Sequence, residues 1–247
     1  MNPLLKPSFR PLSGLKPALM LFSGVLLAGL AAWPAMAAPQ KAAEAATPDD
    51  LAPVKAWIAK STTIRTLIAD FKQQRNLKTV RKPLESTGRV WIKVGGAFRW
   101  QVGDPPKLTA VLSPQGEFTV LNNTKKAAEI FSAKALEKDQ ASQALTFLRV
   151  GFPSSLEAFQ RKFDIVQVTP DGDWDRVELK PAAGTGSSGV VKMGMYLHRG
   201  RHTLGSMQVY LRDGSWIDTV FTSTQENPEI PAALFQPDLT GYSVRRK

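Results

Sequence analysis

The stretch GRVWIKVGGAFRWQVGDPP (residues 88–106) decides the fold class of this chain. Apolar and polar residues alternate on both sides of the Gly-Gly pair at 95–96, which is a strong turn signal. The stretch therefore predicts two antiparallel strands joined by a short turn. It carries Trp91, Phe98 and Trp100, yet it has no histidine, cysteine or serine and only one carboxylate. The hairpin thus offers aromatic surface and almost no group that could perform catalysis.

The same alternation continues outward from this hairpin in both directions. From about Leu67 to about Phe221, short alternating runs are separated by turn signals such as Asp104-Pro105-Pro106. We count ten or eleven strands at near-regular spacing. A meander of this kind predicts a barrel or a strongly curved antiparallel sheet, in a fold that is mainly β with some helix (α+β).

A first helix is predicted ahead of the strands. Its start lies near Asp49 or Asp50, either of which can cap it, and its end lies near Ser61. Within it, Val54 and Trp57 fall on one side together with Ile58, as expected of an amphipathic helix.

Two further short helices are predicted where the alternation stops in the middle of the chain. The first covers residues 137–152 and places Leu145 and Leu148 at helical spacing. The second follows Pro153, and Ser154 and Glu157 in it have the spacing of a capping box. We therefore expect about three helices to cover the sheet.

Residues 1–37 have the layout of a secretory signal peptide. Their first part is basic, residues 18–33 are apolar and uncharged, and Ala35-Met36-Ala37 fits the cleavage rule for small residues. An uncleaved membrane anchor is the alternative, but the apolar run is shorter than the roughly 20 residues that span a bilayer. Residues 38–49 are predicted to be a flexible linker, and residues 50–247 to form one domain.

The chain has 32 Lys and Arg against 21 Asp and Glu, which gives a net charge of +11, and no cysteine. Such an excess suits an anionic membrane surface or an acidic partner, although bases spread along a chain also serve solubility. The fold must form without disulfides, so it depends on burial and sheet pairing. No motif of a nucleic-acid-binding module is present, and we expect no nucleic acid as a partner.

Residue types that perform catalysis are scarce. The two histidines, His198 and His202, flank one turn, and no HExxH spacing or cysteine could complete a zinc site with them. Three nearby acids, Asp171, Asp173 and Asp175, have the composition of a β-turn, which they would support through side-chain hydrogen bonds. We therefore expect no enzyme, no cofactor and no metal, with a hydrolase as the distant alternative.

The hairpin at 88–106 also resembles the signature of the outer-membrane lipoprotein carrier (LolA) family. In that family a Gly-x-hydrophobic-Trp/Tyr-hydrophobic-Lys strand leads to Phe-Arg/Asn-Trp and then to a proline. Matching residues stand at Gly88, Trp91, Lys93, Phe98, Trp100 and Pro105. The family's first strand is matched at Phe71 and Gln73, and its closing stretch at Asn227, Ile230, Phe235 and Gly241. The likeness covers about residues 50–247.

The chain departs from the family at Val94-Gly95. The family usually has Arg-Pro there, and that arginine is thought to hold the helical lid to the barrel. Arg89 and Arg99 are the nearest possible substitutes, but alternation places both on the outer side of the sheet.

The resemblance implies an incomplete, half-open β-barrel that is closed by helices and encloses an apolar cavity for acyl chains. It implies a periplasmic carrier, expected to be a monomer, that takes lipoproteins or other acylated cargo from an inner-membrane transporter to an outer-membrane receptor. The candidate cavity residues are Phe71, Phe98, Trp100, Phe118, Leu145, Leu148, Met193 and Met195.

Two alternatives stay open at this point. Aromatic residues in strands usually pack in a core, so the same side chains are also expected as ordinary core residues. The half-barrel could also belong to a periplasmic regulatory or sensor protein that binds a lipid or a partner protein without carrying it.

Overall fold

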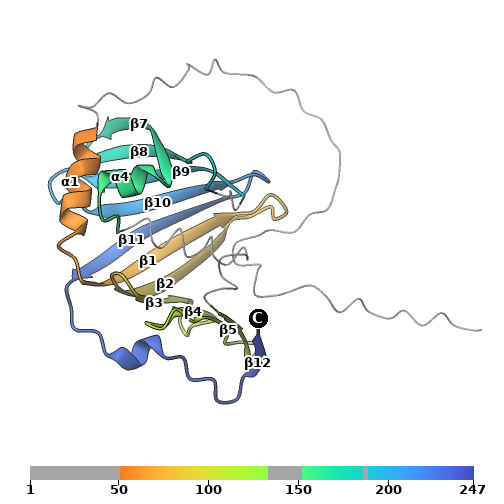
Figure 1. Ribbon diagram of the computed structural model, residues 1–247. Coiled ribbons are helices and arrows are strands. Elements are labelled where there is room, and N and C mark those ends of the chain that lie inside the picture. The colour runs from red at the N-terminus through yellow and green to blue at the C-terminus, as the bar shows by residue number, and fades with distance from the viewer. Residues whose placement is uncertain (1–50, 133–151, 186–188) are drawn as a thin grey trace, which may run out of the picture.

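The computed structural model describes residues 51–132, 152–185 and 189–247, and their strands form one curved sheet (Figure 1). The twelve strands are β1 (Thr66–Asn76), β2 (Leu84–Lys93), β3 (Ala97–Val102), β4 (Leu108–Leu112), β5 (Phe118–Asn122), β6 (Ala127–Phe131), β7 (Phe163–Asp171), β8 (Trp174–Pro181), β9 (Val190–His198), β10 (Leu204–Leu211), β11 (Trp216–Glu226) and β12 (Ser243–Arg246). Their order across the sheet is β12-β6-β5-β4-β3-β2-β1-β11-β10-β9-β8-β7.

The sheet is open, because β7 and β12 lie at its two edges. Every pair of neighbouring strands is antiparallel except β12 and β6, which run parallel. The expectation of an antiparallel, mainly β fold is therefore confirmed in an open sheet of twelve strands rather than ten or eleven. Alternation missed β6 because both of its faces are largely buried, and its one charged residue, Glu129, is buried as well.

Helix α1 (Ala52–Ser61) ends where its sequence predicted, with Val54, Trp57 and Ile58 buried. Its N-cap is Leu51, whose side chain makes no capping hydrogen bond, so the predicted aspartate cap is wrong. A proline in the first turn, where no intrahelical partner for its nitrogen is needed, fits the helix start instead.

Helix α4 (Leu156–Gln160) is shorter than predicted and begins one residue later. Ser155 is its N-cap, and the Ser155 hydroxyl accepts a hydrogen bond from the backbone N–H of Ala158 at 3.1 Å. The helix predicted over residues 137–152 lies almost wholly outside the described residues, and Leu145 and Leu148 with it. Among the described residues, no helix is long and apolar enough to span a bilayer.

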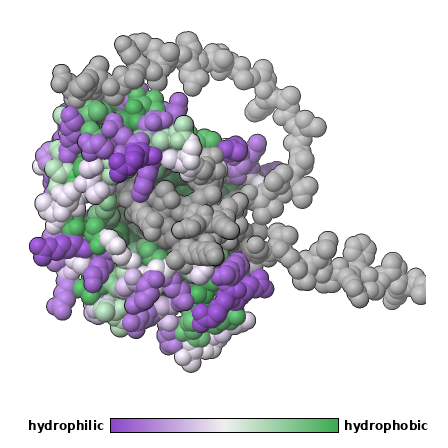
Figure 2. Space-filling view, in the orientation of Figure 1, coloured by the Kyte–Doolittle hydropathy of each residue, from purple (hydrophilic) through white to green (hydrophobic). Residues whose placement is uncertain are grey.

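Two apolar clusters lie on the inner, concave face of the sheet. One packs the inner side chains of β7–β10 against α1 and α4, and Figure 1 shows both helices over this part of the sheet. The other joins the inner side chains of β1–β6, where Phe71, Phe98, Phe118 and Phe131 are all buried. On the surface visible in Figure 2, hydrophobic and hydrophilic residues are mixed.

The outer face of β3–β6 is covered by the segment between β11 and β12, which we call the outer strap (residues 227–242). It contains the 3-10 helix η3 (Ala232–Phe235), and Phe235 is buried. Leu239 and Tyr242 pack against the small outer cluster of β4–β6, and the Tyr242 hydroxyl donates a hydrogen bond to Asn123 Oδ1 at 2.9 Å. This face of the sheet is therefore sealed by the chain itself.

Gly88 lets three neighbouring strands pack closely. The Phe71 ring from β1 stacks on Trp100 from β3, with ring centroids 4.2 Å apart. Between them on β2, a Cβ atom at Gly88 would collide with the Phe71 ring and with the Gln101 carbonyl oxygen. The glycine is thus required by the aromatic stack that lies across it.

We predict that Gly88→Ala lowers the free energy of unfolding by about 1–3 kcal/mol, as overpacking of a filled core does. Gly96→Ala is the matched control, because nothing lies within 4 Å of a Cβ at that position. Urea unfolding of both variants measures the difference. Equal stabilities of the two variants would contradict the role given to Gly88.

Candidate ligand-binding site

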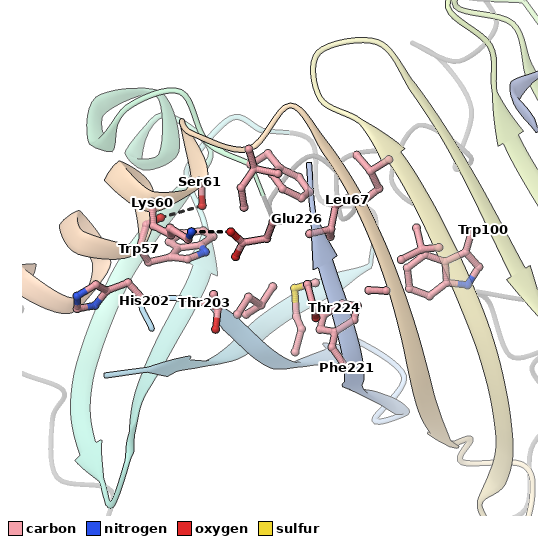
Figure 3. A pocket seen from close by; sticks show the side chains of 17 residues that line it. Trp57, Lys60, Ser61, Leu67, Trp100, His202, Thr203, Phe221, Thr224 and Glu226 are labelled. Carbon is pink, nitrogen blue, oxygen red and sulfur yellow. Dashed lines mark hydrogen bonds and ion pairs between the residues drawn. The ribbon is translucent and has the colours of Figure 1, made fainter. Parts of the chain in front are cut away.

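A pocket opens between α1 and the inner face of the sheet (Figure 3). Its empty space, counted together with space open to solvent, is about 690 Å³. Its walls are Trp57, Lys60, Ser61, Ile64, Leu67, Ala69, Val90, Ile92, Trp100, Phe152, His202, Thr203, Leu204, Met207, Phe221, Thr224 and Glu226. Most of these side chains are apolar.

Strand register brings the floor of the pocket together. Leu67 of β1 lies opposite Ile92 of β2, and Ala69 lies opposite Val90, so all four point inward from two paired strands. Trp100 continues this floor on β3, opposite Val90. The floor is thus apolar because the inward positions of three adjacent strands are apolar.

A β-bulge shapes the wall formed by β11. The register between β1 and β11 shifts between Asp70 and Phe71, so that Thr222 has no partner on β1. Phe221 and Thr224, which strict alternation would place on opposite faces, therefore both line the pocket. No pattern in the sequence indicates this bulge.

The charged groups of the pocket engage each other. Lys60 of α1 and Glu226 at the end of β11 form an ion pair at 2.5 Å, which Figure 3 shows beside Trp57. Ser61 donates a hydrogen bond to the Trp57 carbonyl oxygen at 2.8 Å. Polar groups that satisfy one another in this way leave the remaining wall available to an apolar ligand.

The turn from α1 into β1 is fixed by Asn227, the first residue of the outer strap. The Asn227 Oδ1 atom accepts a hydrogen bond from Arg65 N at 2.7 Å, and its Nδ2 group donates to the Thr63 carbonyl oxygen at 3.3 Å. The backbone N–H of Asn227 donates to the Thr66 carbonyl oxygen at 2.8 Å. One side chain therefore holds the base of α1.

The structure brings one of the eight predicted cavity residues, Trp100, to this pocket. Phe71, Phe98 and Phe118 lie in the inner cluster of β1–β6, and Met193 and Met195 are buried in the cluster beneath α1 and α4. These placements agree with the alternative of ordinary core packing, and a role of these five in binding stays a prediction. Leu145 and Leu148 lie outside the described residues.

Sequence reasoning missed most of the pocket. Trp57 was predicted on the apolar face of the first helix, but no pattern indicated that this face meets the sheet around a pocket. Phe221 was expected only as a strand residue. The long-range pairing of β1 with β11 creates the site, and such pairing leaves no local signal.

Arg89 and Arg99 both lie on the outer face, as alternation predicted. Arg89 pairs with Asp70 across the strands, and this hydrogen bond lowers the pKa of the Asp70 carboxyl. Arg99 donates to the Leu234 carbonyl oxygen of η3 at 3.2 Å, and burial lowers the pKa of its guanidinium. Each is therefore engaged on the outer side of the sheet, away from the pocket.

The histidines do not form a metal site. His198 Nδ1 accepts hydrogen bonds from the backbone N–H groups of Gly200 and Arg201, while His202 lines the pocket. Across residues 51–132, 152–185 and 189–247, no cluster of three or more potential ligands could hold a metal ion.

The three acids near residue 171 do not all serve one turn. The β7–β8 hairpin pairs Asp171 with Trp174, with Gly172 at a positive φ of 57°. Asp175 is instead buried, and its carboxylate accepts a hydrogen bond from Arg199 Nε at 3.0 Å. The expectation that Asp175 supports the turn is therefore wrong, because the residue points inward from β8.

Comparison with known proteins assigns the chain to a family. The family model described as "Outer membrane lipoprotein carrier protein LolA" matches residues 62–238, more than half of the chain. The comparison with curated proteins gave no match.

Several solved structures are similar at low identity. An uncharacterized conserved protein from Thermus thermophilus is 12% identical, with 77% of this chain and 95% of that one covered and a TM-score of 0.47. A putative outer membrane lipoprotein-sorting protein domain from Vibrio parahaemolyticus is 11% identical, with 75% and 95% covered and a TM-score of 0.44. The MucA/MucB complex structure from Pseudomonas aeruginosa contains a chain that is 16% identical, with 77% and 61% covered and a TM-score of 0.37.

The buried carboxylate of Asp175 gives a test of the helix-covered half of the sheet. We predict that Arg199→Met lowers the free energy of unfolding by about 1–3 kcal/mol, because a buried charged acceptor loses its partner. The value should lie near the lower end, since Arg199 is half exposed. Arg201, in the same turn, is exposed, so Arg201→Met is the control. It should change the free energy of unfolding by less than about 0.5 kcal/mol, as measured by thermal unfolding. A loss of the same size in both variants would contradict the pairing.

Proposed function

Because the chain belongs to the outer membrane lipoprotein carrier (LolA) family, we propose that it is a periplasmic carrier for acylated cargo. It would shield the acyl chains of lipoproteins, or of similarly lipidated molecules, on the way from the inner to the outer membrane. An inner-membrane transporter and an outer-membrane receptor would be its partners. The sequence of residues 1–37, which has the layout of an export signal, supports a periplasmic location.

The observation that carries this proposal is the apolar pocket between α1 and the inner face of the sheet. Each methylene withdrawn from water is worth about 0.8 kcal/mol. Exposing a 16-carbon chain to water would therefore cost on the order of 12 kcal/mol of free energy, so a lipidated protein cannot diffuse freely through water. Transfer from a bilayer into an apolar pocket, in contrast, exchanges one apolar surrounding for another.

A carrier must also release its cargo, and the cover over the pocket supports that requirement. The Lys60–Glu226 pair links α1 to β11 at the pocket, but both side chains are about one-third exposed. Such a pair contributes at most about 1 kcal/mol in water. The electrostatic link between α1 and the pocket wall is therefore weak enough to break when cargo is exchanged.

We predict that Phe221→Glu weakens binding of a fluorescent fatty acid at least about tenfold, because it places a carboxylate inside an apolar pocket. Val220→Glu is the matched control. It adds the same charge one residue away, where Val220 is 42% exposed on the outer face of β11. Circular dichroism of both variants checks that the sheet is intact. Equal binding by the two variants would remove the pocket from the proposal.

Native mass spectrometry of the protein purified from the periplasm identifies the cargo class. Co-purified acylated molecules would support the carrier. A single non-acylated periplasmic protein would overturn it and would favour the alternative of a regulatory protein that binds a partner with the same fold.

A further inference from the structure

The β1–β2 hairpin ends in a basic tip (residues 77–84) on the side of the sheet away from α1 (Figure 1). The tip has the sequence LKTVRKPL, with Lys78, Arg81 and Lys82 and no acidic residue. Val80 and Leu84 are among the most exposed large hydrophobic residues of the described chain, at 41% and 39%. Cationic and aliphatic side chains therefore reach solvent together.

The tip has an ordered backbone and uncommitted charges. The backbone N–H of Lys78 donates to Ser215 Oγ at 3.1 Å, and that of Val80 donates to the Leu77 carbonyl oxygen at 3.0 Å. Among the described residues, no ion pair engages Lys78, Arg81 or Lys82. The backbone of the tip is thus anchored at Lys78 and Val80, and no ion pair in the described residues occupies its three charges.

Neighbouring turns at the same end of the sheet add to this charge. Because successive strands are antiparallel, the β3–β4, β5–β6 and β10–β11 turns lie at the end that carries the tip. With the tip, they contain seven basic residues, Lys78, Arg81, Lys82, Lys107, Lys125, Lys126 and Arg212, and two acidic ones, Asp104 and Asp213. At the opposite end, the β2–β3, β4–β5, β7–β8 and β9–β10 turns are balanced, with Arg199 and Arg201 against Glu117 and Asp173.

We propose that the basic tip docks the protein on an anionic bilayer surface. Lys78, Arg81 and Lys82 would meet lipid phosphates, while Val80 and Leu84 enter the interfacial layer between the headgroups. Basic residues close to an anionic membrane attract it individually, and apolar side chains among them add burial. The proposal concerns where the protein touches a membrane, so it goes beyond the carrier function.

A lipid surface suits the tip better than an acidic protein does. A stable protein interface buries about 1,000 Å² or more, which eight residues at the end of a hairpin do not supply. A bilayer needs only a few cations and one or two aliphatic side chains for reversible binding. In addition, a docked tip leaves the pocket accessible, since Leu67 and Ile92 lie near the other end of the same two strands.

Co-sedimentation of the full chain with vesicles tests the proposal. We expect binding to phosphatidylglycerol-containing vesicles at low salt and none to pure phosphatidylcholine. The triple variant Lys78→Gln/Arg81→Gln/Lys82→Gln should bind about a hundredfold more weakly, if each charge contributes about a fivefold factor. The proposal would be overturned if the unaltered protein did not bind the anionic vesicles. It would also be overturned if the protein bound poly-glutamate, an acidic polypeptide, and not the vesicles.

A second triple variant separates position from net charge. Arg65→Gln/Lys93→Gln/Arg201→Gln removes the same charge from three exposed residues at the opposite end of the sheet. It should keep vesicle binding within about threefold of the unaltered protein. An equal loss in both triple variants would show a non-specific charge effect and overturn the proposal.

The absence of cysteine allows a single label to test contact with the membrane. An environment-sensitive fluorophore at Val80→Cys should shift to the blue on anionic vesicles, and one at Val220→Cys should not. If the emission of the label at residue 80 did not shift on anionic vesicles, insertion of the tip would be overturned. Fatty-acid binding by the first triple variant should be unchanged, so a failure of membrane docking is distinguishable from a failure of the carrier function.

Discussion

The pairing of β1 with β11 is the interaction on which the rest of the structure depends. Ten residues of β1 pair with β2, its neighbour in sequence, and ten pair along the other edge of the strand with β11, near the other end of the chain. This single strand therefore joins β2–β6 and β12 on one side to β7–β11 on the other. The pocket lies across this junction, because its floor comes from β1–β3 and its wall from β10 and β11. Without the pairing neither the continuous inner face nor the pocket would exist.

The two faces of the sheet have different tasks. The outer strap seals the outer face of β3–β6, where Leu239 and Tyr242 pack. The inner face instead meets α1, a cover whose link to β11 at the pocket is one partly exposed ion pair. On the proposed function, an acylated guest would reach the sheet from its inner face, where the pocket lies. This one-sided arrangement suits transfer between two membranes, since the guest exchanges one apolar surrounding for another and the protein needs no chemical step.

Local patterns predicted the elements well and the site poorly. The hairpin of β2 and β3 and the end of α1 at Ser61 follow from alternation and helical spacing. β6 escaped because strands buried on both faces do not alternate. Met193 and Met195 were assigned to the correct inward face, but their cover by α1 turns them into core residues. Most of the pocket could not be foreseen, because it depends on a bulge and on the pairing of residues far apart in sequence.

Asn227 connects these two faces mechanically. Its side chain holds the turn between α1 and β1, and its backbone begins the outer strap. A swing of α1 away from the sheet would therefore pull on hydrogen bonds shared with the strap. A protein that binds the strap would therefore be coupled through Asn227 to the position of α1, on the opposite face of the sheet.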